Sequence, residues 1–352
     1  MTLTTEEISP GTDHERVVLC RDPEASYRSV IAIHSTAAGP AVGGTRLWSY
    51  TTEEEAVADA LRLSRGMTYK NAMAGLPLGG GKSVVLKDGE ALDREALFRA
   101  HGRAIERLGG RYIAGEDVGT SPADMEIIRR ETEHVGGILG DPSPNTAHGV
   151  LRAMQAAAFH HWGSDGLAGR TVAIQGCGNV GFQLARELHG AGAILIVTDL
   201  DPERARRVVA TAGARAVEPD RIFETEADVF APCALGGVLN AATIPRLRVE
   251  IVAGAANNQL REDRDGERLR ERDILYAPDY VANAGGVIGG CREVLGWSEE
   301  TARERIEGIY DTMLAVLRLA GEQDVPPHAA ADRLAEQRLA ALYREKGVDR
   351  WT

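Results

Sequence analysis

Residues 171–199 of the chain read TVAIQGCGNVGFQLARELHGAGAILIVTD and contain the most specific structural pattern in the sequence. The apolar run over 171–175 predicts a buried strand, and glycines with the spacing G-x-G-x-x-G follow it directly. A helix is expected after the glycines, and a second strand is expected over 194–198, ending at Asp199. This order of strand, glycine turn, helix and strand is typical of a dinucleotide-binding Rossmann domain.

Each glycine of this pattern has a separate role. Gly176 permits the tight turn, Gly178 lets the backbone approach a pyrophosphate, and Gly181 allows the helix to pack closely on the strand. The helix N-terminus faces the phosphates, and an acid about 20 residues further on binds the ribose hydroxyls. The predicted cofactor-binding residues of this motif are therefore Gly176, Gly178, Asn179, Val180, Gly181 and Asp199.

The acid at position 199 also bears on the choice of cofactor. A carboxylate there repels the 2′-phosphate of NADP, so the sequence favours NAD. Arg204 lies five residues further on and leaves NADP open, because a guanidinium is a good partner for a phosphate.

Strand and helix signals alternate along the chain, which predicts an α/β fold of two domains. The clearest break is the run Gly140-Asp-Pro-Ser-Pro144, where glycine and proline interrupt both patterns. We therefore expect one domain over 1–139 and a Rossmann domain over 140–323. A C-terminal helix in the segment 324–352 is expected to return to the first domain.

Composition excludes several classes of protein. The 352-residue chain has a formal charge of −12, which argues against nucleic acid or an anionic membrane as its main partner. It has no run of eighteen apolar residues and begins with a polar, acidic segment, so a cytoplasmic protein is expected. The four cysteines lack C-x-x-C spacing, and the adjacent His160 and His161 diverge by about 100° on a helix. No metal site is expected.

Lysine is rare in this chain, with four lysines among forty basic residues. Two of them, Lys70 and Lys82, lie twelve residues apart at the ends of a glycine-rich stretch. The compact ammonium of lysine fits beside a small carboxylate, and burial can lower its pKa into the working range, whereas arginine stays protonated. The neighbouring Asn71, Pro77 and glycine run 79–81 favour a lysine-based site over two surface lysines.

Two other functions fit less well. A phosphate-binding P-loop around Lys82 would need glycine at position 76, where the chain has Leu76, and a helix rather than the strand expected over 83–86. A 2-hydroxy-acid dehydrogenase would share the Rossmann domain but would normally use a histidine as its acid–base group. The histidines here lack a recognisable histidine–carboxylate setting.

Further motifs cover most of the chain. They are GPAVGGTR (39–46), GMTYKN (66–71), GGGK (79–82), EDVG (116–119), APCALGG (231–237), AGAANN (253–258) and APDYVANAGG (277–286). Through them the chain resembles, over nearly its whole length, the glutamate/leucine/phenylalanine/valine group of amino-acid dehydrogenases. The resemblance implies NAD-dependent oxidative deamination of an L-amino acid to a 2-oxo acid and ammonia. It also implies that the first domain binds substrate and mediates assembly into a homo-oligomer.

The resemblance further implies roles for single residues. Lys82 would be the base that activates water, and Asp117 would shuttle protons. Lys70 would hold the substrate carboxylate, aided by backbone N–H groups at Gly43 and Gly44. Asn258 would help to bind the substrate, and the nicotinamide end of the cofactor would lie near Thr146, Ala234, Asn257 and Asn283.

The chemistry agrees with a lysine base. Water must add to a carbon that has just lost hydride, so a base with a pKa near neutrality is needed. A free lysine has a pKa of about 10.4. Burial in a cleft, with Lys70 as a like charge nearby, is expected to lower the pKa of Lys82, while Asp117 supplies compensating negative charge.

The preferred amino acid follows from smaller differences. Glutamate enzymes of the group grip the side-chain carboxylate with an additional lysine, and Val42 stands there in this chain, which favours a hydrophobic substrate. Gly115 stands where leucine-type members usually carry alanine and phenylalanine-type members glycine, which leaves room for a ring. At position 287, the valine of this chain is similar to the leucine and valine enzymes of the group. We expect phenylalanine or a related aromatic, with leucine or valine as the alternative and a non-catalytic dinucleotide sensor as a remote one.

Overall fold

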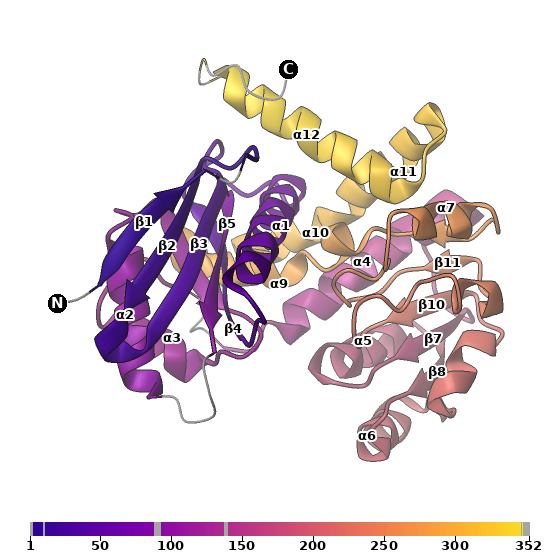
Figure 1. The fold of residues 1–352 in the computed structure, drawn as a ribbon. Coiled ribbons are helices and arrows are strands. Elements are labelled where there is room, and N and C mark those ends of the chain that lie inside the picture. The colour runs from indigo at the N-terminus through magenta and orange to yellow at the C-terminus, as the bar shows by residue number, and fades with distance from the viewer. Residues whose placement is uncertain (1–2, 10, 88–92, 137–139, 346, 348–352) are drawn as a thin grey trace. The chain divides into compact units, whose positions relative to one another are not determined.

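The structure is a computed structural model that describes residues 3–9, 11–87, 93–136, 140–345 and 347. It divides into two compact units, whose elements are labelled in Figure 1. The first unit comprises Met1–Gly140, Gly290–Trp297 and Ala335–Thr352, and the second comprises Asp141–Gly289 and Ser298–Leu334. Each unit contains a β-sheet with helices packed on it, so the predicted α/β fold of two domains is confirmed.

The first unit is built on a mixed sheet with the strand order β1-β2-β3-β5-β4-β6 among the described residues. β4 runs parallel to β5 and β6, whereas the pairs β1–β2, β2–β3 and β3–β5 are antiparallel. Because β4, β5 and β6 are parallel, the loops that follow them leave the same edge of the sheet. The strands are β1 (Thr4–Ile8), β2 (Arg16–Asp22), β3 (Tyr27–Ser35), β4 (Ala41–Trp48), β5 (Gly79–Leu86) and β6 (Tyr112–Glu116).

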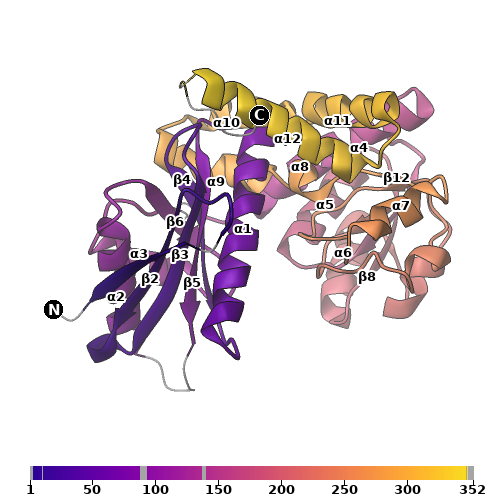
Figure 2. The same cartoon turned by 45° about the horizontal axis from the view of Figure 1, so that its top comes forward.

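Helices cover both faces of this sheet. α1 (Glu53–Met73) lies on one face, and α2 (Arg94–Glu106) with α3 (Pro122–Arg129) lies on the other, as Figure 2 shows. Successive side chains of β3 point to opposite faces of the sheet. Val30 and Ala32 pack into the hydrophobic cluster beneath α1, and Ile31 and Ile33 pack into the hydrophobic cluster beneath α2. This double burial explains why β3 and β5 are buried along almost their whole length.

The glycine run 79–81 belongs to a strand that begins before the one expected over 83–86. α1 carries Lys70 in its last turn, and β5 begins at Gly79 and includes Lys82. The reason is close packing: a Cβ on Gly80 would lie 2.1 Å from the backbone nitrogen of Thr68 on α1. These glycines are strand residues that let the helix approach the sheet, so the two lysines lie on a helix and a strand.

The second unit contains a parallel sheet with the strand order β12-β11-β10-β7-β8-β9 among the described residues. The chain begins in the middle of this sheet and adds strands first toward one edge and then toward the other, which is the Rossmann arrangement. The strands predicted over 171–175 and 194–198 are observed with those bounds. The strands are β7 (Thr171–Gln175), β8 (Ile194–Thr198), β9 (Arg215–Ala216), β10 (Val229–Pro232), β11 (Ile251–Val252) and β12 (Leu275–Tyr276).

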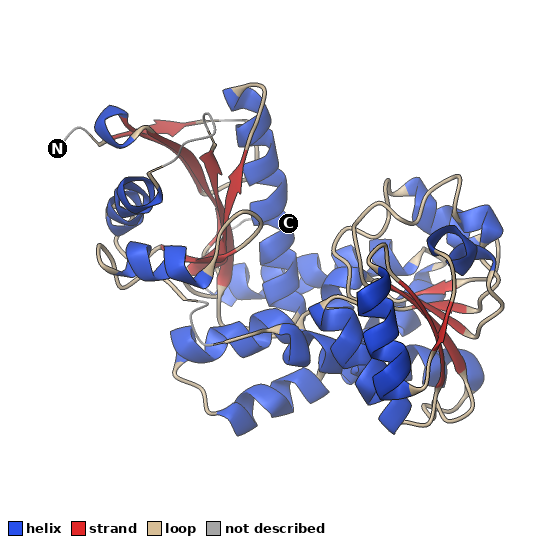
Figure 3. Cartoon of the chain, turned by 90° about the horizontal axis from the view of Figure 1, so that it is seen from below, coloured by secondary structure: helices blue, strands red, loops and turns tan. Residues whose placement is uncertain are grey.

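Helices pack around this second sheet as well, drawn in blue around the red strands in Figure 3. α9 and α12 each contribute residues to both units, since α9 crosses from the second unit to the first at residue 290 and α12 does so at residue 335. The remaining helices are α4 (Ser143–Trp162), α5 (Asn179–Gly190), α6 (Pro202–Ala212), α7 (Arg264–Arg270), α8 (Asp279–Ala282), α9 (Gly285–Leu295), α10 (Glu299–Glu307), α11 (Ile309–Gln323) and α12 (Pro327–Glu345).

Helix length and hydropathy also bear on membrane association. In the part of the chain that the structure describes, no helix combines the length and the apolar character that a membrane crossing requires.

A histidine joins three helices of the second unit. His148 on α4 lies between two carboxylates, with Nδ1 2.9 Å from Glu187 on α5 and Nε2 2.7 Å from Glu307 on α10. Arg152, one turn further along α4, also reaches Glu307 at 2.9 Å. The hydrogen bond to Glu187 raises the pKa of His148, and Glu307 adds to this against the opposing effect of burial. The protonated imidazole therefore stabilises the packing of α4, α5 and α10.

We predict that replacing His148 destabilises the protein in a pH-dependent way. A raised pKa means that the stabilisation is complete below the unfolded value of about 6.5 and is lost as pH rises through the folded value. His148→Gln should therefore lose roughly 1 kcal/mol more stability at pH 6 than at pH 9, measured by urea unfolding. His189→Gln, at an exposed position near the end of α5, is the control and should match wild type. Equal destabilisation of His148→Gln at both pH values would contradict the prediction.

Candidate active site

Lys82 and Asp117 form a buried ion pair in the parallel part of the first sheet. Lys82 lies on β5 and is 5% exposed, and its Nζ is 2.7 Å from Oδ2 of Asp117. Asp117 directly follows β6, at the edge of the sheet where the parallel strands end. The two residues that the sequence predicted to be catalytic are therefore in direct contact.

The loop after β6 is fastened to β4, which fixes the position of Asp117. The backbone N–H of Asp117 donates to the hydroxyl of Thr120 at 2.9 Å, and this hydroxyl donates to the carbonyl of Thr45 at 2.9 Å. Gly119 has a φ of +82°, and a Cβ there would lie 2.1 Å from the carbonyl oxygen of Leu47. Only glycine allows this close approach of the loop to the strand.

The two partners of the pair have pKa values shifted in ways that suit proton transfer. Burial lowers the pKa of Lys82, and the attraction of Asp117 offsets this only in part. Burial alone would raise the pKa of Asp117, but the ammonium of Lys82 and the guanidinium of Arg46 outweigh it, so this pKa lies below its ordinary value. The result is an amine that loses its proton more readily than a free lysine, beside a carboxylate that stays ionised.

Arg46 is a member of this cluster that the sequence did not predict. Its Nε lies 3.1 Å from Oδ2 of Asp117, and it contributes to the lowered pKa of Lys82. Arg46 is thus a cation with this effect that was not expected, and the effect expected of Lys70 on Lys82 stays a prediction. A signal was present in the sequence, because Gly44 and Arg46 are two residues apart and therefore face the same side of β4.

Lys70 lies in the last turn of α1 and is half-buried. Its helix is held on β5 just beyond it, because Nδ2 of Asn71 donates to the carbonyl oxygen of Gly79 at 2.6 Å. Lys70 therefore has a fixed backbone position on the helix that packs against the strand carrying Lys82.

Of the predicted substrate-binding positions on β4, Gly44 lies directly beside the ion pair. A Cβ on Gly44 would lie 2.7 Å from Cβ of Asp117 and 3.2 Å from Nζ of Lys82, so any side chain there would displace the pair. A Cβ on Gly43 would lie 1.7 Å from the carbonyl oxygen of Gly81 on β5. Gly43 thus serves close strand packing, while Gly44 keeps space beside the ammonium.

Two further positions on these strands differ in the room they leave. Gly115 pairs with Gly44 across β4 and β6, and a Cβ on it would meet only the carbonyl oxygen of Gly136, at 3.9 Å. Gly115 is not among the glycines with a positive φ, so the backbone does not require glycine there. Val42 is half-buried on β4 and brings no charge to this part of the sheet.

The glycine turn of the second unit has the geometry that its sequence predicted. Gly176 has a φ of +97°, a Cβ on Gly181 would lie 2.0 Å from the carbonyl oxygen of Gly176, and a Cβ on Gly178 would meet nothing within 4 Å. Asn179 and Val180 begin α5 directly after this open position. The carboxylate of Asp199 accepts from the backbone N–H of Cys177 at 2.6 Å. An open backbone position at a helix N-terminus, with a carboxylate fixed beside it, fits the pyrophosphate and ribose of a dinucleotide.

The remaining predicted residues also lie in the second unit. Asn283 donates to the side chain of Asn257 at 2.8 Å, and a Cβ on Gly286 would lie 2.4 Å from the hydroxyl of Thr146. Ala234 lies beside the turn, because its Cβ would be 2.8 Å from a Cβ on Gly176.

Two residues predicted to contact the substrate belong to this unit rather than to the unit that contains Lys82. Asn258 adopts a left-handed conformation, with a φ of +51°, and Val287 is half-buried on α9.

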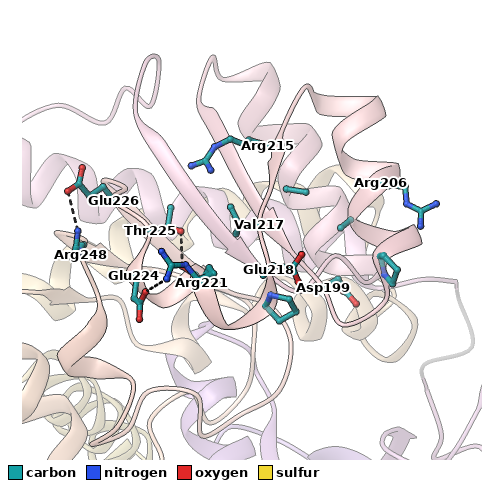
Figure 4. A pocket seen from close by; sticks show the side chains of 14 residues that line it. Asp199, Arg206, Arg215, Val217, Glu218, Arg221, Glu224, Thr225, Glu226 and Arg248 are labelled. Carbon is teal, nitrogen blue, oxygen red and sulfur yellow. Dashed lines mark hydrogen bonds and ion pairs between the residues drawn. The ribbon is translucent and has the colours of Figure 1, made fainter.

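A cavity of about 940 Å³ lies in the second unit beside α6 and β9, with Asp199 in its wall (Figure 4). Four of the charged side chains in its wall pair with each other, since Arg221 lies 3.1 Å from Glu224, and Arg248 lies 3.5 Å from Glu226. Neither Lys82 nor Asp117 lines it. Among the described residues, no group of three or more histidine, cysteine or acidic side chains is arranged to hold a metal ion.

Comparison with known proteins identifies the family. Residues 14–134 match the family model described as Glu/Leu/Phe/Val dehydrogenase, dimerisation domain. Residues 197–347 match the model described as Glutamate/Leucine/Phenylalanine/Valine dehydrogenase. The chain belongs to the Glu/Leu/Phe/Val dehydrogenase family. It is therefore an amino-acid dehydrogenase, an oxidoreductase that acts on CH–NH₂ donors, and the family implies a nicotinamide cofactor.

Similar members of this dehydrogenase family have different substrates in their names. The chain is 52% identical to the leucine dehydrogenase of Thermoactinomyces intermedius, over 96% of this chain and 93% of that protein. It is 48% identical to the valine dehydrogenase of Streptomyces coelicolor, over 93% and 92% respectively. The crystal structure of L-tryptophan dehydrogenase from Nostoc punctiforme matches with a TM-score of 0.87 and 46% identity, covering 94% of this chain and 97% of that one.

Proposed function

We propose that this dehydrogenase converts a hydrophobic L-amino acid, water and NAD⁺ into the 2-oxo acid, ammonia and NADH, with Lys82 as the base. The observation that carries the proposal is the buried contact between Lys82 and Asp117. An isolated ammonium in this position would be costly to bury, and the carboxylate compensates for it without restoring the ordinary pKa of lysine. A lysine of this kind can take a proton from water near neutral pH.

Most groups in the proposed steps belong to the first unit, and Asn258 belongs to the second. Acceptance of the hydride from the α-carbon of the substrate is the chemistry that a nicotinamide cofactor would supply when bound. Water then adds to that carbon while Lys82 takes one of its protons, which passes by way of Asp117 to the amino group. When the carbon–nitrogen bond breaks, Lys82 takes the proton of the added hydroxyl, so that the 2-oxo acid and ammonia are formed. Lys70 holds the substrate carboxylate as its charge partner, with the backbone of Gly43 and Gly44 as hydrogen-bond donors, and Asn258 assists in binding.

We assign cofactor binding to the second unit. The open backbone at Gly178 and the helix N-terminus at Asn179 and Val180 suit the pyrophosphate. The carboxylate of Asp199 suits the ribose hydroxyls and repels a 2′-phosphate, which favours NAD. Gly176 and Gly181 shape the turn, and the nicotinamide is assigned to Thr146, Ala234, Asn257 and Asn283.

The substrate class rests on the absence of charge and on the space near the pair. Val42 offers nothing to a side-chain carboxylate, and the room at Gly115 would accept an aromatic ring. We place phenylalanine or a related aromatic slightly ahead. Leucine or valine is the alternative substrate. Similar proteins include leucine and valine dehydrogenases as well as a tryptophan dehydrogenase, and Val287 would suit the smaller side chains.

Assembly and location complete the proposal. The model that matches residues 14–134 is described as a dimerisation domain, which supports a homo-oligomer. We assign substrate binding and assembly to residues 1–139, cofactor binding to 140–323, and packing on the first domain to the helix in 324–352. A cytoplasmic location is proposed from the composition of the chain.

A spectrophotometric screen tests the function directly. Purified enzyme is incubated with each of twenty L-amino acids and with NAD⁺ or NADP⁺, and absorbance of the reduced cofactor is followed. We expect turnover with aromatic or branched aliphatic amino acids, no turnover with glutamate, and a preference for NAD⁺. Asp199→Ser should narrow that preference, because it removes the charge that repels the extra phosphate. If the wild-type enzyme used NAD⁺ and NADP⁺ equally well, Asp199 would not select NAD⁺.

Lys82→Ala tests the base. We expect kcat to fall at least about a hundredfold, the usual contribution of a general base, with the dissociation constant for NADH near that of wild type. Lys87→Ala, which changes the lysine just after β5, is the matched control and should keep wild-type turnover. If Lys82→Ala retained more than a tenth of wild-type kcat, Lys82 would not be the base.

Gly115→Ala tests the pocket. The structure leaves room for the added methyl group, so the protein should fold normally, and the methyl should occupy space that an aromatic substrate needs. Overpacking of this kind costs about 1–3 kcal/mol, so kcat/KM for phenylalanine should fall roughly tenfold relative to that for leucine. The ratio of the two specificity constants is the quantity to measure, because it cancels any general loss of active enzyme. An unchanged ratio would place the substrate side chain elsewhere.

A further inference from the structure

Arg46 connects the ion pair to a second carboxylate. It lies on β4, and its guanidinium contacts Asp117 through Nε at 3.1 Å and Asp59 on α1 through Nη1 at 2.9 Å. Only about a fifth of each of the three side chains is exposed. Arg46 therefore bridges the loop after β6 and the helix that carries Lys70.

The contact with Asp117 is made at the atom that Lys82 also uses. Nζ of Lys82 and Nε of Arg46 lie 2.7 Å and 3.1 Å from the same oxygen, Oδ2. One carboxylate oxygen thus faces two cations. When Lys82 gives up its proton, Arg46 still neutralises the carboxylate, so Asp117 is not left as an unpaired buried anion.

Asp59 fixes the guanidinium in this orientation. Its Oδ2 accepts from Arg46 and also from the hydroxyl of Tyr50 at 2.6 Å, and its Oδ1 accepts from Arg62 at 2.8 Å. The rigid, planar fork of arginine can reach two carboxylates in fixed directions, which a lysine ammonium on a flexible stem does not reproduce.

We propose that Arg46 is a positioning residue for the deamination, which holds Asp117 as a carboxylate beside Lys82 and allows Lys82 to alternate between its protonated and neutral forms. The inference rests on the proposed function, since it takes Lys82 as the base. Arg46 itself touches neither substrate nor cofactor in this assignment and acts through Asp117.

The charged surroundings of Lys82 set the direction of the expected effect. Asp117 on the loop after β6 and Asp59 on α1 favour the protonated amine, and Arg46 on β4 opposes it. The other charged groups on these elements are Glu53, Glu54, Glu55, Arg62, Arg65 and Lys70 on α1 and Glu116 at the end of β6. Removing Arg46 leaves the carboxylates without their shared cation, so Lys82 should hold its proton to higher pH.

The experiment compares pH profiles of kcat/KM for oxidative deamination. In Arg46→Gln the acid limb should move to higher pH by about one unit, the size expected for a charge about 5 Å away at intermediate dielectric. Activity near neutrality should fall about tenfold and recover at alkaline pH. Arg62→Gln, which loses a contact to Asp59 but none to Asp117, is the matched control and should keep the wild-type limb. A uniform loss of activity at all pH values, without movement of the limb, would overturn the proposal.

A second readout does not depend on turnover. The chain has four lysines, so ¹³Cε-lysine labelling gives a small set of signals, and that of Lys82 is identified by its absence in Lys82→Ala. The titration midpoint of this signal should rise in Arg46→Gln, and an unchanged midpoint would overturn the proposal. Arg46→Lys, which restores a cation without the fork, should return the midpoint only part of the way to the wild-type value, because an ammonium does not hold both carboxylates in the same directions. If Arg46→Gln does not fold, Arg46→Lys is compared with wild type; its midpoint should be the higher of the two, and an equal midpoint would overturn the proposal.

Different results would contradict the proposed function and the role of Arg46. If wild type deaminates no amino acid, the proposed function is wrong. If wild type is active and Lys82→Ala is not, but neither the limb nor the signal moves in Arg46→Gln, only the role of Arg46 is wrong.

Discussion

Burial of the charge on Lys82 is the constraint on which the first unit depends. Removing an ammonium from water costs several kcal/mol, and the cost is offset only if a carboxylate lies in contact with it. That contact requires a register in which the middle of β5 is level with the end of β6, since Thr45 on β4 pairs with both Ser83 and Glu116. It also requires a loop fastened so that Asp117 cannot turn outward. The hydroxyl of Thr120 and the left-handed Gly119 provide the fastening. The parallel order of β4, β5 and β6 is therefore a condition for the ion pair as well as a way to bury apolar side chains.

Glycine serves two different purposes in this protein, and the space around each glycine distinguishes them. At Gly43 and Gly181 a Cβ would fall within about 2 Å of a backbone oxygen, so glycine there allows strands or helices to approach closely. At Gly178 a Cβ would meet nothing, and at Gly115 it would barely reach a neighbour. At these two positions packing does not require glycine, and space is left beside the backbone. Gly178 and Gly115 lie in the stretches proposed to bind cofactor and substrate.

The sequence predicted those parts of the structure that depend on neighbours along the chain. The strands at 171–175 and 194–198 and the turn between them follow from local apolar runs and glycine spacing. The predicted strand over 83–86 is shorter than β5 because glycine has a low strand propensity. The three glycines of β5 are strand residues through pairing with β3 and β4, which are distant in the sequence. The role of Arg46 was missed for a related reason. Its partner Asp117 is 71 residues away, and only the register of β4 against β6 brings the two together.

The bias of the chain toward arginine gains a physical meaning at this cluster. Thirty-six of the forty basic residues are arginine, yet the position facing Asp117 from β5 is lysine and the position facing it from β4 is arginine. The two cations share one oxygen but have opposite requirements. Arginine keeps its charge at any working pH and can hold two carboxylates at once, so it suits the constant part of the cluster. Lysine can lose its proton when buried, so it suits the part that must change charge during a reaction. Exchanging Lys82 and Arg46 would conserve the total charge of the cluster. It would also put a permanently charged guanidinium on β5, where the amine that can lose its proton now contacts Asp117.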